Sequence, residues 1–504
     1  MHCAHHPTCP GCALLDLPYA RQLEIKHARL AEAVGRYPHL GLPAPPPVLP
    51  APHTEGYRHR LKLPLDARRD PPAVGLYATG PSRRVLDTPD CPVLAPGLRR
   101  GLDAVRRALR GHREVHSVDL RISDATGELQ LVVAADGGSL RGGKGTARAL
   151  MDAVPGLASV AVSRADPARK RVMGRTPQSL LGSPHVEEAI GSTRYRLYPG
   201  AFFQVDPRSA VGLQALVAEL VGPARTVLDL YAGVGAYALA LAPGRTRVLA
   251  VEEVPQAAAA ARAMAPPQVE VVAARVEDLA LDEPFDVAIL NPARRGSDPD
   301  VLARLARLAE RVIYVSCGPE TLARDLDVLA AHGLGVDHWQ PLDLFPQTPE
   351  VETVVHLVRR APLRTWKVPG GHAGGPWHGH PSGAVGAATE AVALVVGDPG
   401  PRGRAATATW ERLGVVATHA LLRLSLTGPL PAALDALARR GHPLAGLDPR
   451  TSRFFADKAG LLRPFAHVTR ARRVGAPIHG DLMQALVTLG ASPQLLERLA
   501  RAGR

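Results

Sequence analysis

Between residues 200 and 360, hydrophobic runs alternate with polar and turn-forming stretches in a pattern that predicts buried strands. Apolar runs cover residues 226–230, 247–251, 285–290 and 311–317, and another begins at residue 353. A glycine turn follows the first run, and an Ala/Leu-rich segment with helical periodicity comes next. This order of strand, turn and helix predicts an α/β fold with a doubly wound sheet, whose ligand crevice lies at the carboxyl ends of the strands.

The first 200 residues show a different pattern. Residues 19–40 have the periodicity of an amphipathic helix, and residues 43–52 form a Pro-rich connector with neither helical nor strand periodicity. Short β-like runs then recur from residue 57 to about residue 199, separated by turn-rich pieces. The basic run at residues 57–62 fits a phosphate contact and fits a solvated edge strand equally well.

Composition sets the remaining boundaries. Residues 362–387 are rich in Gly, His and Pro, which predicts a linker whose histidines reflect composition rather than a metal site. The residues after it are numerous enough for a small domain. We therefore divide the chain into a β-rich region (1–196), the α/β domain (197–361), a linker (362–387) and a C-terminal domain (388–504).

The turn after the first apolar run carries Gly233 and Gly235. Such a turn brings bare backbone N–H groups at the start of a helix against a nucleotide-like ligand. Glu252 ends the next run, nineteen residues after Gly233. An acid at about this distance can accept hydrogen bonds from ribose hydroxyls. Because many α/β folds contain a glycine turn, its neighbours must decide what it binds.

Cys317 closes the fourth run and precedes a Gly-Pro pair. A structural thiol usually lies in the middle of an element among apolar neighbours, so this position favours a nucleophile. Since the carboxyl ends of parallel strands meet at one edge, Gly233, Glu252, Asn291 and Cys317 should lie close together. Arg294 and Arg295, which follow Asn291 closely in sequence, are suited to contact a phosphate or a base, or to form plain salt bridges.

Four of the five cysteines lie in the first fifth of the chain: Cys3, Cys9, Cys12 and Cys91. Three thiolates close in sequence and one remote are a usual set for a cubane iron–sulfur cluster. Tetrahedral zinc is the alternative, because His5 and His6 lie near enough to compete as ligands. Five cysteines in 504 residues argue against a disulfide framework.

The net charge of +13 and the pI of about 9.9 favour a polyanionic partner such as nucleic acid. Compositional bias of a GC-rich genome is the alternative source of this charge. The sequence contains neither an apolar run of membrane-spanning length nor a secretory signal at its start. We therefore expect a cytoplasmic, soluble protein, and a monomer.

Four motifs, in the same order, resemble those of the RNA (uracil-5-)-methyltransferases that use S-adenosylmethionine. They are Asp229-Leu-Tyr-Ala-Gly-Val-Gly235, Asn291-Pro-Ala-Arg-Arg-Gly296, Tyr314-Val-Ser-Cys-Gly-Pro-Glu-Thr-Leu-Ala-Arg-Asp325, and Asp343-Leu-Phe-Pro-Gln-Thr348 with Val351-Glu352. The resemblance covers roughly residues 1–360 and is specific, because four ordered motifs rarely match by chance. It implies a Rossmann-like methyltransferase domain behind an N-terminal iron–sulfur and β-rich RNA-binding region.

The resemblance also implies roles for single residues. The family's cofactor-binding positions correspond to Gln204, Tyr231, Glu252 and Asn291, its nucleophile to Cys317 and its general base to Glu352. Its [4Fe–4S] ligands correspond to Cys3, Cys9, Cys12 and Cys91. Those cysteines, and an Asn followed by two arginines in the second motif, resemble the short branch that methylates 23S ribosomal RNA. The tRNA branch lacks the cluster cysteines.

Three positions depart from the family pattern: Ala293 replaces a usual proline, Gly318 a usual asparagine and Glu350 a usual histidine. These departures leave room for a non-catalytic, cluster-containing RNA-binding protein, and a tRNA methyltransferase is the enzymatic alternative. A cytosine-5 enzyme fits less well, because Pro292 is followed by alanine rather than by cysteine. For the leading function, a uridine must be unstacked into the pocket, which favours a loop or single-stranded target.

The C-terminal tail resembles the later part of large-subunit pseudouridine synthases over about residues 388–504. The matching runs are Ala393-Leu-Val-Val-Gly397, Leu421-Leu-Arg-Leu-Ser-Leu-Thr-Gly428, Arg440-Gly-His-Pro-Leu-Ala-Gly446 and Arg463-Pro-Phe-Ala-His467. No counterpart of that family's catalytic Arg-Leu-Asp segment is present upstream. We therefore expect a small α+β domain that is degenerate and serves in RNA binding or packing.

Overall fold

The structure of the chain is a computed structural model. It describes residues 2–360, except 38–39, 80–83, 167–171, 174–176 and 281–282, and the backbone of six strands after residue 387. Two compact units are present, one of Met1–Val34 with Leu42–Pro362 and one of Gly35–Gly41 with Leu363–Arg504. Among the described residues, no helix combines the length and the apolar character needed to cross a lipid bilayer.

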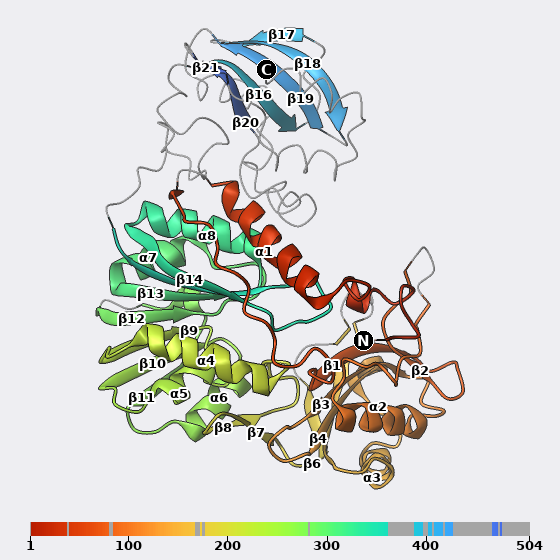
Figure 1. The fold of residues 1–504 in the computed structure, drawn as a ribbon. Helices are drawn as coiled ribbons and strands as arrows, with labels where there is room; N and C mark the ends of the chain where they lie inside the picture. The colour runs from red at the N-terminus through yellow and green to blue at the C-terminus, as the bar shows by residue number, and fades with distance from the viewer. Residues whose placement is uncertain are drawn as a thin grey trace. The chain divides into compact units, whose positions relative to one another are not determined.

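The first unit contains a seven-stranded sheet in the order β11-β10-β9-β12-β13-β15-β14 (Figure 1). Its parallel strands are β9 (Thr226–Leu230), β10 (Arg247–Glu252), β11 (Val269–Ala273), β12 (Phe285–Leu290) and β13 (Ala309–Ser316). The antiparallel strands are β15 (Glu352–Arg359) and β14 (Leu334–Leu342). The expected α/β fold is confirmed. Cys317 lies one residue beyond β13, although the sequence predicted it as the last residue of that strand.

Helices cover both faces of this sheet, as Figure 1 shows. They are α4 (Pro207–Val221), α5 (Ala236–Leu241), α6 (Pro255–Met264), α7 (Pro299–Leu308) and α8 (Pro319–Ala331). Four of the five begin with proline, which loses no helical hydrogen bond at that position. Because both faces are covered, the central strands are almost wholly buried, which explains their continuous apolar runs.

The β-rich region forms a second sheet in the order β2-β1-β3-β4-β5-β6. Its strands are β1 (Arg60–Asp66), β2 (Ala73–Val74), β3 (Val115–Ile122), β4 (Leu129–Ala135), β5 (Leu157–Arg164) and β6 (Gln178–Gly182). The helices α2 (Pro96–Ala108) and α3 (Lys144–Ala153) pack on it and share its apolar core. The hairpin of β7 (Val186–Ile190) and β8 (Thr193–Leu197) instead contributes buried side chains to the α/β core.

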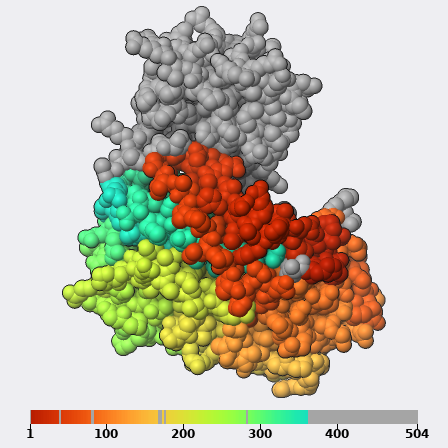
Figure 2. All heavy atoms as spheres, viewed as in Figure 1, coloured from red at the N-terminus to blue at the C-terminus, as the bar shows by residue number. Residues whose placement is uncertain are grey.

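Helix α1 (Tyr19–Gly35) joins the N-terminal segment to the α/β domain. In Figure 2 the N-terminal residues, drawn in red, lie across both the β-rich region and the α/β domain. The buried Lys26 ammonium lies 2.5 Å from a carboxylate oxygen of Asp343, which is buried too. The Gln22 side chain donates to Gln347 Oε1 at 2.8 Å. The sequence predicted that this helix extends to residue 40, but it ends at Gly35. The Tyr-Pro pair at residues 37–38 follows shortly after, and the residue before a proline disfavours the helical conformation.

Lys26→Met should lower the free energy of unfolding by about 3–5 kcal/mol, because it leaves the Asp343 carboxylate buried without its cation. Urea denaturation measures this loss. Arg21→Met on the same helix is the matched control, since Arg21 pairs with Glu24 in an exposed salt bridge and should cost less than about 1 kcal/mol. Equal losses for the two variants would contradict the prediction.

The second unit is described by its strands. They form an antiparallel sheet in the order β17-β18-β19-β16-β20-β21. Their bounds are β16 (Ala388–Val396), β17 (Arg402–Ala405), β18 (Ala408–Val416), β19 (His419–Leu426), β20 (Ala466–Ala471) and β21 (Val474–Gly475). The predicted linker, residues 362–387, and the tail motif at residues 440–446 lie outside the described residues.

Candidate active site

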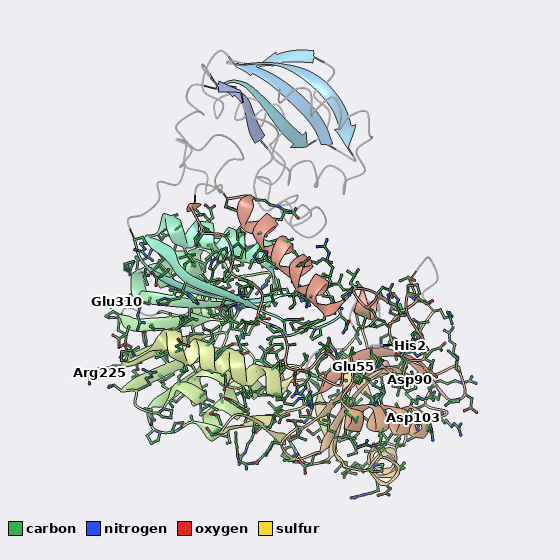
Figure 3. All side chains as sticks on the ribbon, in the orientation of Figure 1. His2, Glu55, Asp90, Asp103, Arg225 and Glu310 are labelled. Carbon is green, nitrogen blue, oxygen red and sulfur yellow. The ribbon has the colours of Figure 1, made fainter. Side chains whose placement is uncertain are left out.

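A cleft of about 1470 Å³ lies between the β-rich region and the carboxyl ends of the central strands. Its walls include Arg58 and Lys62 from the β-rich region and the connecting segment 198–205. Six residues predicted from the sequence line it together: Gln204, Tyr231, Glu252, Asn291, Cys317 and Glu352. Figure 3 labels Arg225 and Glu310, which lie at the amino ends of β9 and β13 on the side away from the β-rich region. Tyr231, Glu252, Asn291 and Cys317 therefore lie at the edge where the parallel strands end, and Glu352, at the start of antiparallel β15, lies at the same edge.

The glycine turn after β9 is held by Glu252. One carboxylate oxygen accepts the N–H of Gly233 and the other accepts the N–H of Val254, both at 2.8 Å. Gly233 has a φ of +59°, and a Cβ there would meet no atom within 4 Å. Each carboxylate oxygen keeps a second lone pair, so Glu252 can accept two further hydrogen bonds from a ligand. The turn thus places the unobstructed backbone of Gly233 beside the two carboxylate oxygens of Glu252, which can accept hydrogen bonds from a ligand.

Three further side chains surround this turn. Tyr231, with a φ of +61°, shares a 2.8 Å hydrogen bond between its hydroxyl and the Ser297 Oγ. Asn291 follows β12 directly, and Gln204 reaches the cleft from the segment after β8. The four side chains predicted to bind the cofactor thus come from four different segments and face one cavity.

Two residues near the turn were not singled out from the sequence. Asp229, at the buried end of β9, accepts the Ala238 N–H with Oδ2, while its Oδ1 has no hydrogen-bond partner among the described residues. Burial raises the pKa of Asp229 to about 7. Phe202 lines the cleft with 66 % of its surface exposed. An exposed aromatic side chain in a cleft is suited to stack on a nucleobase, and the Phe-Phe-Gln run at residues 202–204 was the sequence feature that could have indicated it.

Cys317 and Glu352 face each other across the ends of two paired strands. The antiparallel register of β13 and β15 pairs Ser316 with Thr353, so the next position places Cys317 opposite Glu352. Cys317 is half-buried, and Glu352 is 3 % exposed. A thiol and a carboxyl group at one strand edge have the arrangement of a nucleophile with a proton acceptor.

Burial raises the pKa of Glu352 to about 8, while Arg294 lowers it and Glu350 raises it. Burial, and after it the charge of Glu352, likewise raise the pKa of the Cys317 thiol to about 11, although Arg294 acts to lower it. Near neutral pH both groups therefore hold their protons in the free protein. Arg294 is the cation that favours the reactive, deprotonated form of each.

Arg294 forms the salt bridge that the sequence left as one alternative. Its Nη1 lies 3.4 Å from Oε1 of Glu350, although 70 % of its side chain is exposed.

The basic run at residues 57–62 matches neither of its two predicted roles, phosphate contact or solvated edge strand, along its whole length. Over Arg60–Lys62, β1 pairs with β3, and Arg60 is buried in an ion pair with Asp119, so the run is not simply a solvated strand.

The four N-terminal-region cysteines are free, partly exposed thiols. The N-terminal segment contacts the loop that carries Cys91, since His5 Nε2 lies 2.8 Å from Oδ1 of Asp90. Figure 3 shows His2 and Asp90 on the same side of the molecule. Burial, together with the charges of the other three cysteines, raises the pKa of Cys12 to about 12. Within the described residues, no group of three or more His, Cys, Asp and Glu side chains has the arrangement of a metal site.

Comparison with known proteins gives a consistent set of similarities. The family model described as tRNA (Uracil-5-)-methyltransferase matches residues 267–360. An uncharacterized RNA methyltransferase of Gloeobacter violaceus is 35% identical over 374 residues, which cover 70% of this chain and 81% of the relative. One of Thermosynechococcus vestitus is 34% identical and covers 71% and 83%.

A solved structure extends the likeness to three dimensions. The Pyrococcus abyssi tRNA (uracil-54, C5)-methyltransferase, in complex with S-adenosyl-L-homocysteine, superposes with a TM-score of 0.57 at 27% identity. The match covers 70% of this chain and 86% of the other.

Proposed function

Because this chain belongs to the S-adenosylmethionine-dependent uracil-5 RNA methyltransferase family, we propose that it methylates carbon 5 of a specific uridine in 23S ribosomal RNA. The observation that carries the chemistry is the facing of Cys317 and Glu352 at the strand edge of one cleft. The choice of ribosomal RNA rests on the four N-terminal-region cysteines and on Asn291 with its two following arginines.

The proposed reaction begins at carbon 6, because carbon 5 of uracil is too weak a nucleophile to take a methyl group directly. The Cys317 thiolate attacks carbon 6, and the electron pair of the 5,6 double bond moves toward the carbonyl as an enolate. When bound, S-adenosylmethionine would supply an electrophilic methyl group to carbon 5 and leave as S-adenosylhomocysteine. Glu352 takes the proton from carbon 5, and elimination restores the double bond and releases the Cys317 thiolate.

We propose that Gln204, Tyr231, Glu252 and Asn291 hold the cofactor. The donor set fits, since Glu252 offers acceptors for ribose hydroxyls beside open backbone at Gly233. Glu252→Gln should weaken S-adenosylhomocysteine binding by roughly 10- to 100-fold in calorimetry, because it removes a charged acceptor. Glu270→Gln, on the exposed end of the neighbouring strand, is the control and should keep full affinity. Equal binding by both variants would refute the role of Glu252.

Methylation of tRNA is the second candidate, and the Pyrococcus abyssi structure favours it. Mass mapping of 23S rRNA fragments and of tRNA, each treated with the protein and S-adenosylmethionine, distinguishes the two. A mass gain of one methyl group in place of a hydrogen, on a single rRNA uridine, is expected. A gain on tRNA alone would replace rRNA as the substrate. RNA binding without methyl transfer would instead identify a non-catalytic protein.

We also propose that Cys3, Cys9, Cys12 and Cys91 hold a [4Fe–4S] cluster. Supporting this, Cys3, Cys9 and Cys91 lie near enough to Cys12 for their charges to raise its pKa, and backbone N–H groups of Gly11 and Val93 donate hydrogen bonds to the sulfurs of Cys9 and Cys91. A thiol-only donor set suits iron–sulfur chemistry or zinc. Iron and acid-labile sulfide in anaerobically purified protein, lost in Cys12→Ser, would support the cluster. Zinc alone would refute it.

For residues 388–504 we propose a degenerate pseudouridine-synthase-like accessory domain, on the resemblance of its motifs and the absence of the catalytic segment from the sequence. The proposal predicts that treated RNA gains no pseudouridine. Chemical mapping that detects this mass-silent change would contradict it.

A further inference from the structure

Arg29 of helix α1 binds the segments next to both reacting groups. Its Nε and Nη2 lie 3.2 Å from the two carboxylate oxygens of Glu320, the second residue of α8, which begins just after Cys317. Its Nη1 donates to the Pro349 carbonyl at 3.1 Å and lies 3.4 Å from Oε2 of Glu350. One half-buried guanidinium therefore connects the start of the helix after Cys317 with the loop before Glu352.

Glu350 continues this chain of contacts into the cleft. Its second oxygen, Oε1, lies 3.4 Å from Nη1 of Arg294, so its carboxylate bridges two guanidinium groups. The side chain of Arg294 is otherwise mostly exposed, and an exposed arginine loses conformational freedom when it is held in one place. Glu350 is also a position at which this sequence departs from the family pattern, so the bridge is a feature of this chain's own residues.

The bridge has two opposing electrostatic effects on Cys317. The charged groups that act on the thiol are Glu352, Arg294 and Glu350. The carboxylate of Glu350 itself raises the pKa of Cys317, whereas the guanidinium that it holds lowers it. These effects have opposite signs, so removal of Glu350 reveals which of them dominates.

We propose that Arg29 and Glu350 are positioning residues that hold Arg294 beside the Cys317–Glu352 pair. The proposal deepens the proposed function and rests on it for the identity of the reacting pair. In this arrangement Arg29 orients Glu350 through Nη1, Glu350 orients Arg294, and Arg294 stabilises the thiolate and the carboxylate by its charge. Helix α1 thereby takes part in the active site without lining the cleft.

The test measures alkylation of Cys317 by iodoacetamide as a function of pH, with the peptide that carries Cys317 quantified by mass spectrometry. Glu350→Gln and Arg29→Gln should each shift the profile to higher pH by about one unit, equal to a roughly tenfold slower reaction at a fixed lower pH. The double variant should shift no further than either single variant, because both act through Arg294. Arg21→Gln, on the exposed side of α1, should leave the profile unchanged.

Two outcomes would overturn the proposal. A shift to lower pH in Glu350→Gln would show that Glu350 acts only through its own negative charge, and an unchanged profile in Arg29→Gln would leave Arg29 a packing role. Arg29→Lys, which keeps the charge but not the forked geometry, should give a smaller shift and serves if Arg29→Gln fails to fold. Alkylation requires neither RNA nor methyl transfer, so failure of the proposed function would appear separately, as wild-type protein that alkylates normally yet methylates no RNA.

Discussion

Replacing Cys317 by alanine should abolish covalent capture of RNA that contains 5-fluorouridine and lower methyl transfer on the order of 10⁴-fold or more. Fluorine at carbon 5 cannot leave as a proton, so the wild-type protein should stall as a thioether between Cys317 and carbon 6 of the base. The alanine variant has no atom to form this bond. Denaturing electrophoresis of protein with labelled RNA and S-adenosylmethionine measures the adduct.

Binding of S-adenosylhomocysteine is the control for Cys317→Ala, because the thiol lies outside the glycine turn and its loss should leave cofactor affinity unchanged. Adduct that persists in this variant would place the nucleophile elsewhere. The pH dependence adds a second check. Burial raises the pKa of Cys317 to about 11, so the wild-type capture rate should rise from neutral toward alkaline pH as the thiolate fraction grows.

The sequence predicted four of the five parallel strands and missed the edge strand β11 (Val269–Ala273), because strands covered on both faces leave continuous apolar runs, whereas β11 exposes Glu270 and Ala273. It did not predict β14 (Leu334–Leu342). Asp337 and His338 are exposed in that strand, a glycine lies near its start and a proline near its end, so no apolar run or alternation marks it. The antiparallel position of β15 between β13 and β14 follows from long-range pairing, which local periodicity does not encode.

The site residues also divide into those whose position the sequence could predict and those whose position it could not. The ends of parallel strands must meet, so Glu252, Asn291 and Cys317 could be placed together from strand order alone. The facing of Cys317 and Glu352 required the register of two antiparallel strands, and before that register was known, Glu352 came only from family resemblance.

The contacts of α1 could not be predicted from the sequence. Arg29 and Lys26 read as ordinary polar positions of an amphipathic helix. Their partners Glu350 and Asp343 lie more than 300 residues away in the chain, and no spacing rule connects them. Contacts of buried polar side chains with partners distant in sequence therefore cannot be predicted from local sequence patterns.

Glu352→Gln should separate the two halves of the reaction. The amide cannot take the proton from carbon 5, so methylated RNA should remain attached to Cys317, and turnover should fall by roughly 10²- to 10⁴-fold. The first step should survive, because the neutral amide replaces a carboxyl group that is itself neutral below about pH 8, and at higher pH its lack of charge favours the Cys317 thiolate. Ordinary uridine RNA, without fluorine, should therefore form a stable adduct that carries the new methyl group, as mass spectrometry of the adduct would show.

The same substitution should stabilise the fold, with a pH dependence whose sign follows from the raised pKa. Glu352 holds its proton up to about pH 8 in the folded chain, against an ordinary value of 4.5. Between these values the folded state binds more protons than the unfolded state, so wild-type stability falls as pH rises through this window. Glutamine does not titrate, and its melting temperature should exceed that of wild type at pH 8 and match it more closely at pH 4. Glu310→Gln, exposed at the opposite edge of the sheet (Figure 3), should show neither the adduct nor the pH-dependent gain. A Glu352→Gln variant that turns over normally would assign the proton acceptor to another group, whereas loss of both turnover and adduct would place Glu352 before methyl transfer.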